Sequence, residues 1–120
     1  MKIVVTAQGP TADSPVDPRF GRARYFVLFD TETGTFTAHD NVQNLNATQG
    51  AGIQAAQAVV ELGAQAVLTG NVGPKAFATL QAGSVTIYPG ASGTVRKALE
   101  NLEAGRLEPA AKANVEGHWI

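Results

Sequence analysis

A single α/β domain on a mixed five-stranded sheet is the fold class that this 120-residue sequence predicts. Short apolar runs of strand length occupy much of the first 40 residues. After residue 50, apolar residues recur at intervals of three or four, as on the buried face of a helix. Short apolar runs then alternate with such helical segments, which favours parallel strands joined by helices. The length and the 44% of hydrophobic residues suit one domain with one core.

The first half of the chain predicts a three-stranded antiparallel meander. Lys2–Ala7 is a continuous apolar, β-branched run, which is typical of a buried central strand. Tyr25–Asp30 and the alternating Thr35–Asp40 are the next strands, joined by a hairpin turn at Glu32–Gly34, and the third is expected at a sheet edge. A long loop runs to about Arg22 between the first two strands, and its three prolines argue against regular structure there.

The second half predicts helices and strands in alternation. Gly63 and Gly105 follow two of the helices and are suited to end them, and Pro74 lies near the first position of another. Either Ser92 or Thr94 can cap the last helix. The predicted helices cover residues 53–62, 73–82 and about 94–103, and the predicted strands cover residues 66–69 and 84–88.

This order of elements predicts strand order 3-2-1-4-5, with strand 2 antiparallel and helices on both faces of the sheet. Such an arrangement is a three-layer, ribonuclease H-like fold. We assign residues 1–107 to this domain and residues 108–120 to a C-terminal tail, which either belongs to the domain or is flexible. The aromatic end of the tail, His118–Ile120, suggests docking.

Composition argues against several functions. The formal net charge is −1, whereas a general nucleic-acid binder is expected to be basic. There is no cysteine, so disulfides, thiol catalysis and clusters held by thiolates are excluded. No apolar run is long enough to span a bilayer or to act as a signal peptide, so we expect a cytoplasmic protein.

Glycine-rich loops are expected at the sheet edge where a ligand should bind. In open α/β sheets, ligands bind beyond the carboxyl ends of the strands, where the winding changes direction. In the predicted order this point lies between strands 1 and 4. The loops there are residues 8–22, 70–75 and 89–94, and they include glycine-rich segments.

Cations and helix N-termini in these loops predict an anion site. Arg19, Arg22 and Arg24 form a local cationic patch, which can either bind an anion or pair with nearby aspartates as solvated surface charges. Residues 69–75 and 89–94 each lead from a strand into a helix. Helix N-termini offer backbone N–H groups to anions. Residues 50–55 also match the G-x-G-x-x-A pattern of dinucleotide-binding proteins, but they do not directly follow the first strand. Close helix packing therefore explains their small residues better.

Four segments together resemble the dinitrogenase iron–molybdenum cofactor family. They are residues 17–26, 50–57, 68–77 and 93–98, and the resemblance covers roughly residues 1–107. One departure is Gln49, where many relatives have histidine, which is a strong metal ligand.

The resemblance implies a non-enzymatic carrier that holds a preassembled molybdenum–copper sulfide cluster noncovalently, without direct ligation by side chains. Arg19, Arg22 and Lys75 would supply charge, backbone N–H groups of the loop glycines would donate to cluster sulfur, and Phe20 and Val72 would exclude water. The expected cofactor-binding residues are Gln8, Gly9, Pro10, Thr11, Arg19, Phe20, Gly21, Arg22, Gln49, Gly50, Gly52, Gly70, Asn71, Val72, Gly73, Pro74, Lys75, Gly90, Ser92, Gly93 and Thr94.

Two alternatives remain at this point. Family members often accompany Mrp/MinD-like ATPases, so the chain can instead be a regulatory or adaptor module that binds such a partner without a cofactor. An enzyme is the weaker alternative. The first predicted strand carries no carboxylate for a two-metal nuclease, and neither His39 nor His118 has a visible nucleophile beside it.

Overall fold

Five strands form one mixed sheet in the order β3-β2-β1-β4-β5. The computed structural model describes residues 1–41 and 50–114. The strands are β1 (Lys2–Ala7), β2 (Tyr25–Asp30), β3 (Thr35–Asp40), β4 (Ala66–Leu68) and β5 (Thr86–Tyr88). The helices are α2 (Ala51–Glu61), α3 (Pro74–Ala82) and α4 (Val95–Glu103), together with a short 3-10 helix, η1 (Phe20–Arg22).

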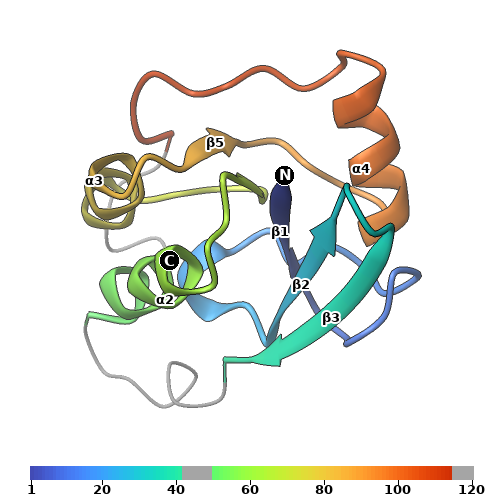
Figure 1. Cartoon of the computed structure of the whole chain (residues 1–120). Coiled ribbons are helices and arrows are strands. Elements are labelled where there is room, and N and C mark those ends of the chain that lie inside the picture. The colour runs from blue at the N-terminus through green and yellow to red at the C-terminus, as the bar shows by residue number, and fades with distance from the viewer. Residues whose placement is uncertain (42–49, 115–120) are drawn as a thin grey trace.

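The predicted strand order and directions are confirmed. β1 pairs antiparallel with β2, so that Ala7 lies opposite Tyr25, and parallel with β4, so that Val4 lies opposite Val67. β3 is an edge strand, as predicted, and pairs only with β2 among the described strands. Figure 1 shows α2 and α3 together on one side of the strands and α4 on the other, which gives the three layers.

Two apolar clusters hold these layers together, one on each face of the sheet. Val4 and Val67 point toward α2 and α3 and belong to the first cluster, which includes Phe77. Val5 and Leu68 point the other way and belong to the second cluster, which packs against α4. Neighbouring residues of a strand point to opposite faces, and therefore the continuous apolar runs of β1 and β4 supply both clusters.

Some element boundaries differ from the prediction. Helix α2 begins at Ala51, two residues early, because Gln54 N–H already bonds to the Gly50 carbonyl at 3.0 Å. Strand β5 begins at Thr86, two residues late, because Ser84 has a φ of 62° and its N–H closes the end of α3. The predicted long loop contains the 3-10 helix η1, a single turn that starts two residues after the last proline of the loop.

The chain after α4 runs back past β5 toward α3 (Figure 1). Ala110 N–H donates to the Ile87 carbonyl at 2.8 Å, which covers part of the outer edge of β5. The predicted docking of His118–Ile120 lies outside the described residues. No helix in the described part of the chain is long and apolar enough to cross a membrane.

Candidate anion-binding site

Three loops meet at the carboxyl edge of the parallel strands. They follow β1, β4 and β5, and the confirmed strand order places the change of winding between β1 and β4. Asn71 N–H donates to the Pro18 carbonyl at 2.7 Å, and Phe20 N–H donates to the Asn71 carbonyl at 3.2 Å. Val16 N–H donates to the Gly93 carbonyl at 2.8 Å. The β1 loop is therefore bonded to both of the other loops.

Gly70 lets two of these backbones approach closely. A Cβ atom at this position would lie 2.6 Å from both Cα and the carbonyl oxygen of Pro18. Such distances are well inside van der Waals contact, so only glycine fits beside Pro18 without a shift of the chain. The requirement for glycine at residue 70 is thus steric.

Hydrogen bonds of two buried hydroxyl groups link the ends of the strands to the loops. Thr6 and Thr69 are fully buried, and their Oγ1 atoms lie 2.8 Å apart. The Thr6 hydroxyl also bonds to the backbone carbonyl of Asp17 at 2.8 Å. The Asp17 carboxylate, in turn, accepts from Arg19 N–H at 3.0 Å. These bonds connect β1 and β4 to the segment that carries Arg19.

Arg19 and Lys75 lie at this edge, are exposed, and make no ion pair with a described residue. Asp13 pairs with Arg96 at 3.2 Å. Asp30 lies opposite Lys2 at the other end of β1, where its carboxylate accepts from the backbone N–H of Glu32. Pairing with aspartates therefore does not account for Arg19.

Arg24 and Arg22 differ from Arg19 in their surroundings. The guanidinium carbon of Arg24 lies 5.8 Å from the centre of the Tyr25 ring, a cation–π distance. Arg22 is half-buried in η1. The three arginines thus do not form one uniform patch.

The N-terminus of α3 has backbone N–H groups without partners among the described residues. Pro74 is the first helical residue and has no N–H group, and the N–H groups of Gly73, Lys75 and Ala76 make no hydrogen bond within the described chain. A helix of nine residues carries a partial positive charge at this end. The α3 start can therefore accept an anion without giving up a protein hydrogen bond.

The N-terminus of α4 is different, and the prediction that its N–H groups are free for an anion is wrong for the first three helical residues. Its N–H groups are already bonded within the protein. Val95 N–H donates to Ser14 and Arg96 N–H to Ala12, at 2.9 and 2.8 Å, while Lys97 N–H donates to the Thr94 hydroxyl at 3.1 Å. The β1 loop folds over this helix end and satisfies it. Just before the helix, the N–H groups of Ser92, Gly93 and Thr94 have no partner in the described structure.

Two apolar residues expected near the ligand lie beneath the surface. Phe20 is fully buried, and its ring lies 6.2 Å from that of Phe26. Val72 is also buried in the same cluster. Both side chains support the loops from the core side.

Close packing explains the small residues at the start of α2, since a Cβ on Gly21 would lie 3.0 Å from the backbone of Gly52.

The predicted site residues therefore divide by exposure. Gln49 lies outside the described residues. The exposed ones are Gln8, Pro10, Thr11, Arg19, Gly50, Pro74, Lys75, Gly90, Ser92 and Gly93; the half-buried ones are Gly9, Arg22, Gly52, Asn71 and Thr94; and the buried ones are Phe20, Gly21, Gly70, Val72 and Gly73.

Asn114 in the tail also contacts these loops, although it is not among the predicted site residues. The segment around it has no periodic pattern, so no sequence signal pointed to it. Within residues 1–41 and 50–114, no group of three or more His, Cys, Asp or Glu residues is placed to hold a metal ion.

Comparison with known proteins decides the family. The family model for dinitrogenase iron–molybdenum cofactor matches residues 1–105. The chain belongs to this family. The chain is similar to the apo form of the orange protein from Desulfovibrio gigas, with 44% identity and a TM-score of 0.92 over 95% of this chain and 96% of that one.

Two further proteins are similar to this chain at lower identity. A putative NifB protein from Thermotoga is 34% identical, with a TM-score of 0.83 over 97% of this chain and 98% of that one. An uncharacterised protein of Methanocaldococcus jannaschii is 24% identical over 101 residues, which cover 82% of this chain and 86% of the relative. The resemblance seen in the sequence is therefore confirmed at the level of family and fold.

Proposed function

We propose that this protein is a carrier that holds a preassembled molybdenum–copper sulfide cluster noncovalently at the carboxyl edge between β1 and β4. The observation that carries the proposal is the start of α3. Its N–H groups have no partner among the described residues, and they follow the loop that is bonded to the Arg19 segment. The family and the orange protein support a cofactor carrier. The molybdenum–copper composition is what the family resemblance implies.

The chemistry of such a cluster matches these groups. A thiometalate cluster is a polyanion whose sulfur atoms accept hydrogen bonds. Arg19 and Lys75 would supply positive charge, and the N–H groups of Gly73 and Lys75 would donate to sulfur. A chain with no cysteine has no thiolate to offer, so the cluster would bring its own sulfide. Neither the relatives nor the described residues favour an ATPase partner, and we place the adaptor role second.

Reconstitution tests this proposal. The purified protein is incubated with tetrathiomolybdate and a copper salt, desalted, and assayed by absorption spectroscopy and metal analysis. We expect a charge-transfer band and retention of both metals. Failure of the wild-type protein to retain either metal would contradict the proposed function.

A charge-matched pair of variants tests the location. Arg19→Ala with Lys75→Ala removes these two exposed cations and should weaken retention about tenfold, since each exposed charge contributes modestly. The control, Arg106→Ala with Lys2→Ala, removes the same charge away from the loops of the site. Equal weakening in both variants would mean that the cluster responds only to net charge, and the assigned location would be wrong.

A further inference from the structure

The side chain and backbone of Asn114 together make four hydrogen bonds to the loop after β4. Its Oδ1 accepts from Val72 N–H at 2.8 Å, and its own N–H donates to the Val72 carbonyl at 3.2 Å. Its Nδ2 lies 3.3 Å from the Gly70 carbonyl and 3.2 Å from Oδ1 of Asn71. An asparagine amide has one acceptor and two donors, and here all three functions point at one short segment.

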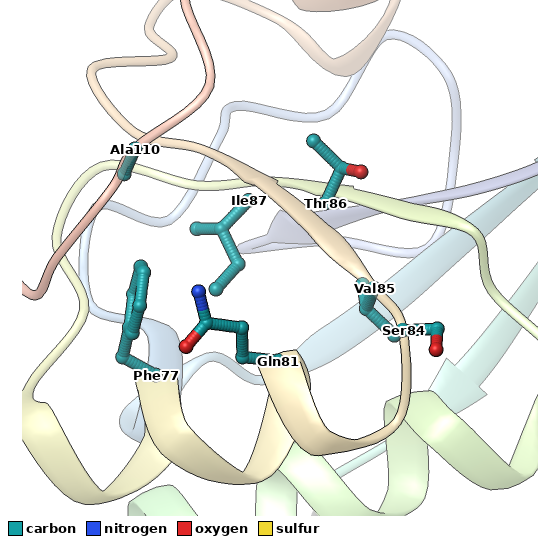
Figure 2. Close-up of a pocket in the computed structure, with 7 residues that line it drawn as sticks. All are labelled: Phe77, Gln81, Ser84, Val85, Thr86, Ile87 and Ala110. Carbon is teal, nitrogen blue, oxygen red and sulfur yellow. The ribbon is translucent and has the colours of Figure 1, made fainter.

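The tail that carries Asn114 is itself attached to the domain. Ala110 N–H bonds to the Ile87 carbonyl, and Ala110 and Ala113 pack against the apolar cluster under α2 and α3. Figure 2 shows Ala110 beside Ile87 and Phe77, where these residues line a pocket of about 270 Å³. Asn114 therefore reaches the loop from a backbone that is fixed four residues earlier.

The loop held by Asn114 is held on its other side by the β1 loop. Asn71 donates from its backbone N–H to the Pro18 carbonyl at 2.7 Å, and it accepts from Phe20 N–H at 3.2 Å. Arg19 lies between Pro18 and Phe20 in the chain and forms an isolated parallel β-bridge with Asn71. One residue, Asn71, thus connects the tail to the segment of Arg19, and α3 begins three residues later.

We infer that Asn114 is a positioning residue of the anion site: the tail clamps residues 70–72 so that the start of α3 and the Arg19 segment keep their mutual placement. This inference rests on the proposed function for its ligand. The matched family model ends at residue 105, so the clamp lies outside the part of the chain that defines the family. Asn114 itself would not touch the cluster.

The test compares Asn114→Ala with Asn101→Ala in the full-length protein. Asn101 lies on α4 and accepts a hydrogen bond from Arg106, so its replacement is the same chemical change away from the site. Amide hydrogen exchange is measured without any ligand, and retention of tetrathiomolybdate with copper is measured separately. In Asn114→Ala we expect about tenfold faster exchange at Val72 and several-fold weaker retention, because an amide loses its acceptor. Asn101→Ala should match the wild type in both.

Each outcome decides the inference. Unchanged exchange at Val72 in Asn114→Ala would mean that the clamp does not form in solution, and the inference would be overturned. Faster exchange with unchanged retention would also overturn it, since the clamp would be structural only. If the wild-type protein retains no metal, the proposed function and the positioning role both fail, while exchange at Val72 still shows whether the clamp exists.

Discussion

Gly70→Ala tests most directly whether the backbones of Gly70 and Pro18 approach as closely as the structure shows. The added Cβ would lie 2.6 Å from both Cα and the carbonyl oxygen of Pro18 and 2.8 Å from its Cβ. To reach ordinary contact distances, the two backbones must separate by about 1 Å. The Asn71–Pro18 hydrogen bond would then stretch from 2.7 Å beyond hydrogen-bonding distance, and the Phe20–Asn71 bond starts at 3.2 Å already.

The expected cost follows from these contacts. Loss of two backbone hydrogen bonds lowers the free energy of unfolding by about 1–3 kcal/mol. Residual overpacking adds about 1 kcal/mol, and the reduced entropy of the unfolded chain returns about 0.4–1 kcal/mol. We therefore expect a net loss of about 1–3.5 kcal/mol, which is a fall in Tm of about 4–14 °C for a domain of this size.

Thermal and urea unfolding, followed by circular dichroism, measure this loss. Gly34→Ala is the control, because Gly34 has open space around its Cβ position but a φ of 70°. That variant should lose only the penalty for a left-handed residue, about 1–2 kcal/mol, without any effect on cluster retention. A Tm for Gly70→Ala within 2 °C of the wild type would refute the close approach of the two backbones.

Three further predictions address the support and charge of the site. Thr6→Val keeps the shape of a buried side chain but leaves the Asp17 carbonyl without its donor, so urea unfolding should show a loss of about 1–3 kcal/mol, whereas Thr6→Ser should lose less. Thr94→Ala removes the cap of α4 and should lower stability by about 1 kcal/mol in the same assay, while Ser92→Ala should be neutral; a reversed order would contradict the assignment of Thr94 as the cap. Cluster retention should weaken as the salt concentration rises from about 0.05 to 0.5 M, because exposed charges are screened; retention that does not vary with salt would argue against a Coulombic contribution.

Most of the fold could be predicted because its signals are local. The runs at Lys2–Ala7 and Ala66–Leu68 are apolar on both faces, which marks central strands, and the spacing after residue 50 marks helices. The boundaries were less accurate. Ser84 continues an apparent strand in the sequence, but its left-handed backbone and its bond to the end of α3 delay β5. Such end effects depend on neighbouring elements and not on residue type.

The candidate site could be predicted only in part. The glycine-rich loops and the cations Arg19 and Lys75 were visible in the sequence, and strand order brought these loops to one edge. The state of each helix N-terminus was not visible. The α3 and α4 starts both follow glycine-rich loops in the sequence. Ser14 and Ala12 occupy N–H groups of α4, whereas the first N–H groups of α3 have no partner in residues 1–41 and 50–114. Backbone partners from a distant loop leave no trace in the sequence.

The sequence by itself determined the family, the order of strands and helices, and the absence of any cysteine ligand. These depend on residue types and their spacing, which are properties of single segments. Only the tertiary structure decided which N–H groups stay unbonded, that Phe20 lies in the core, and that Asn114 reaches the Gly70–Val72 loop. These features are contacts between segments far apart in the chain, and their energies arise only when the packed sheet and helices bring those segments together.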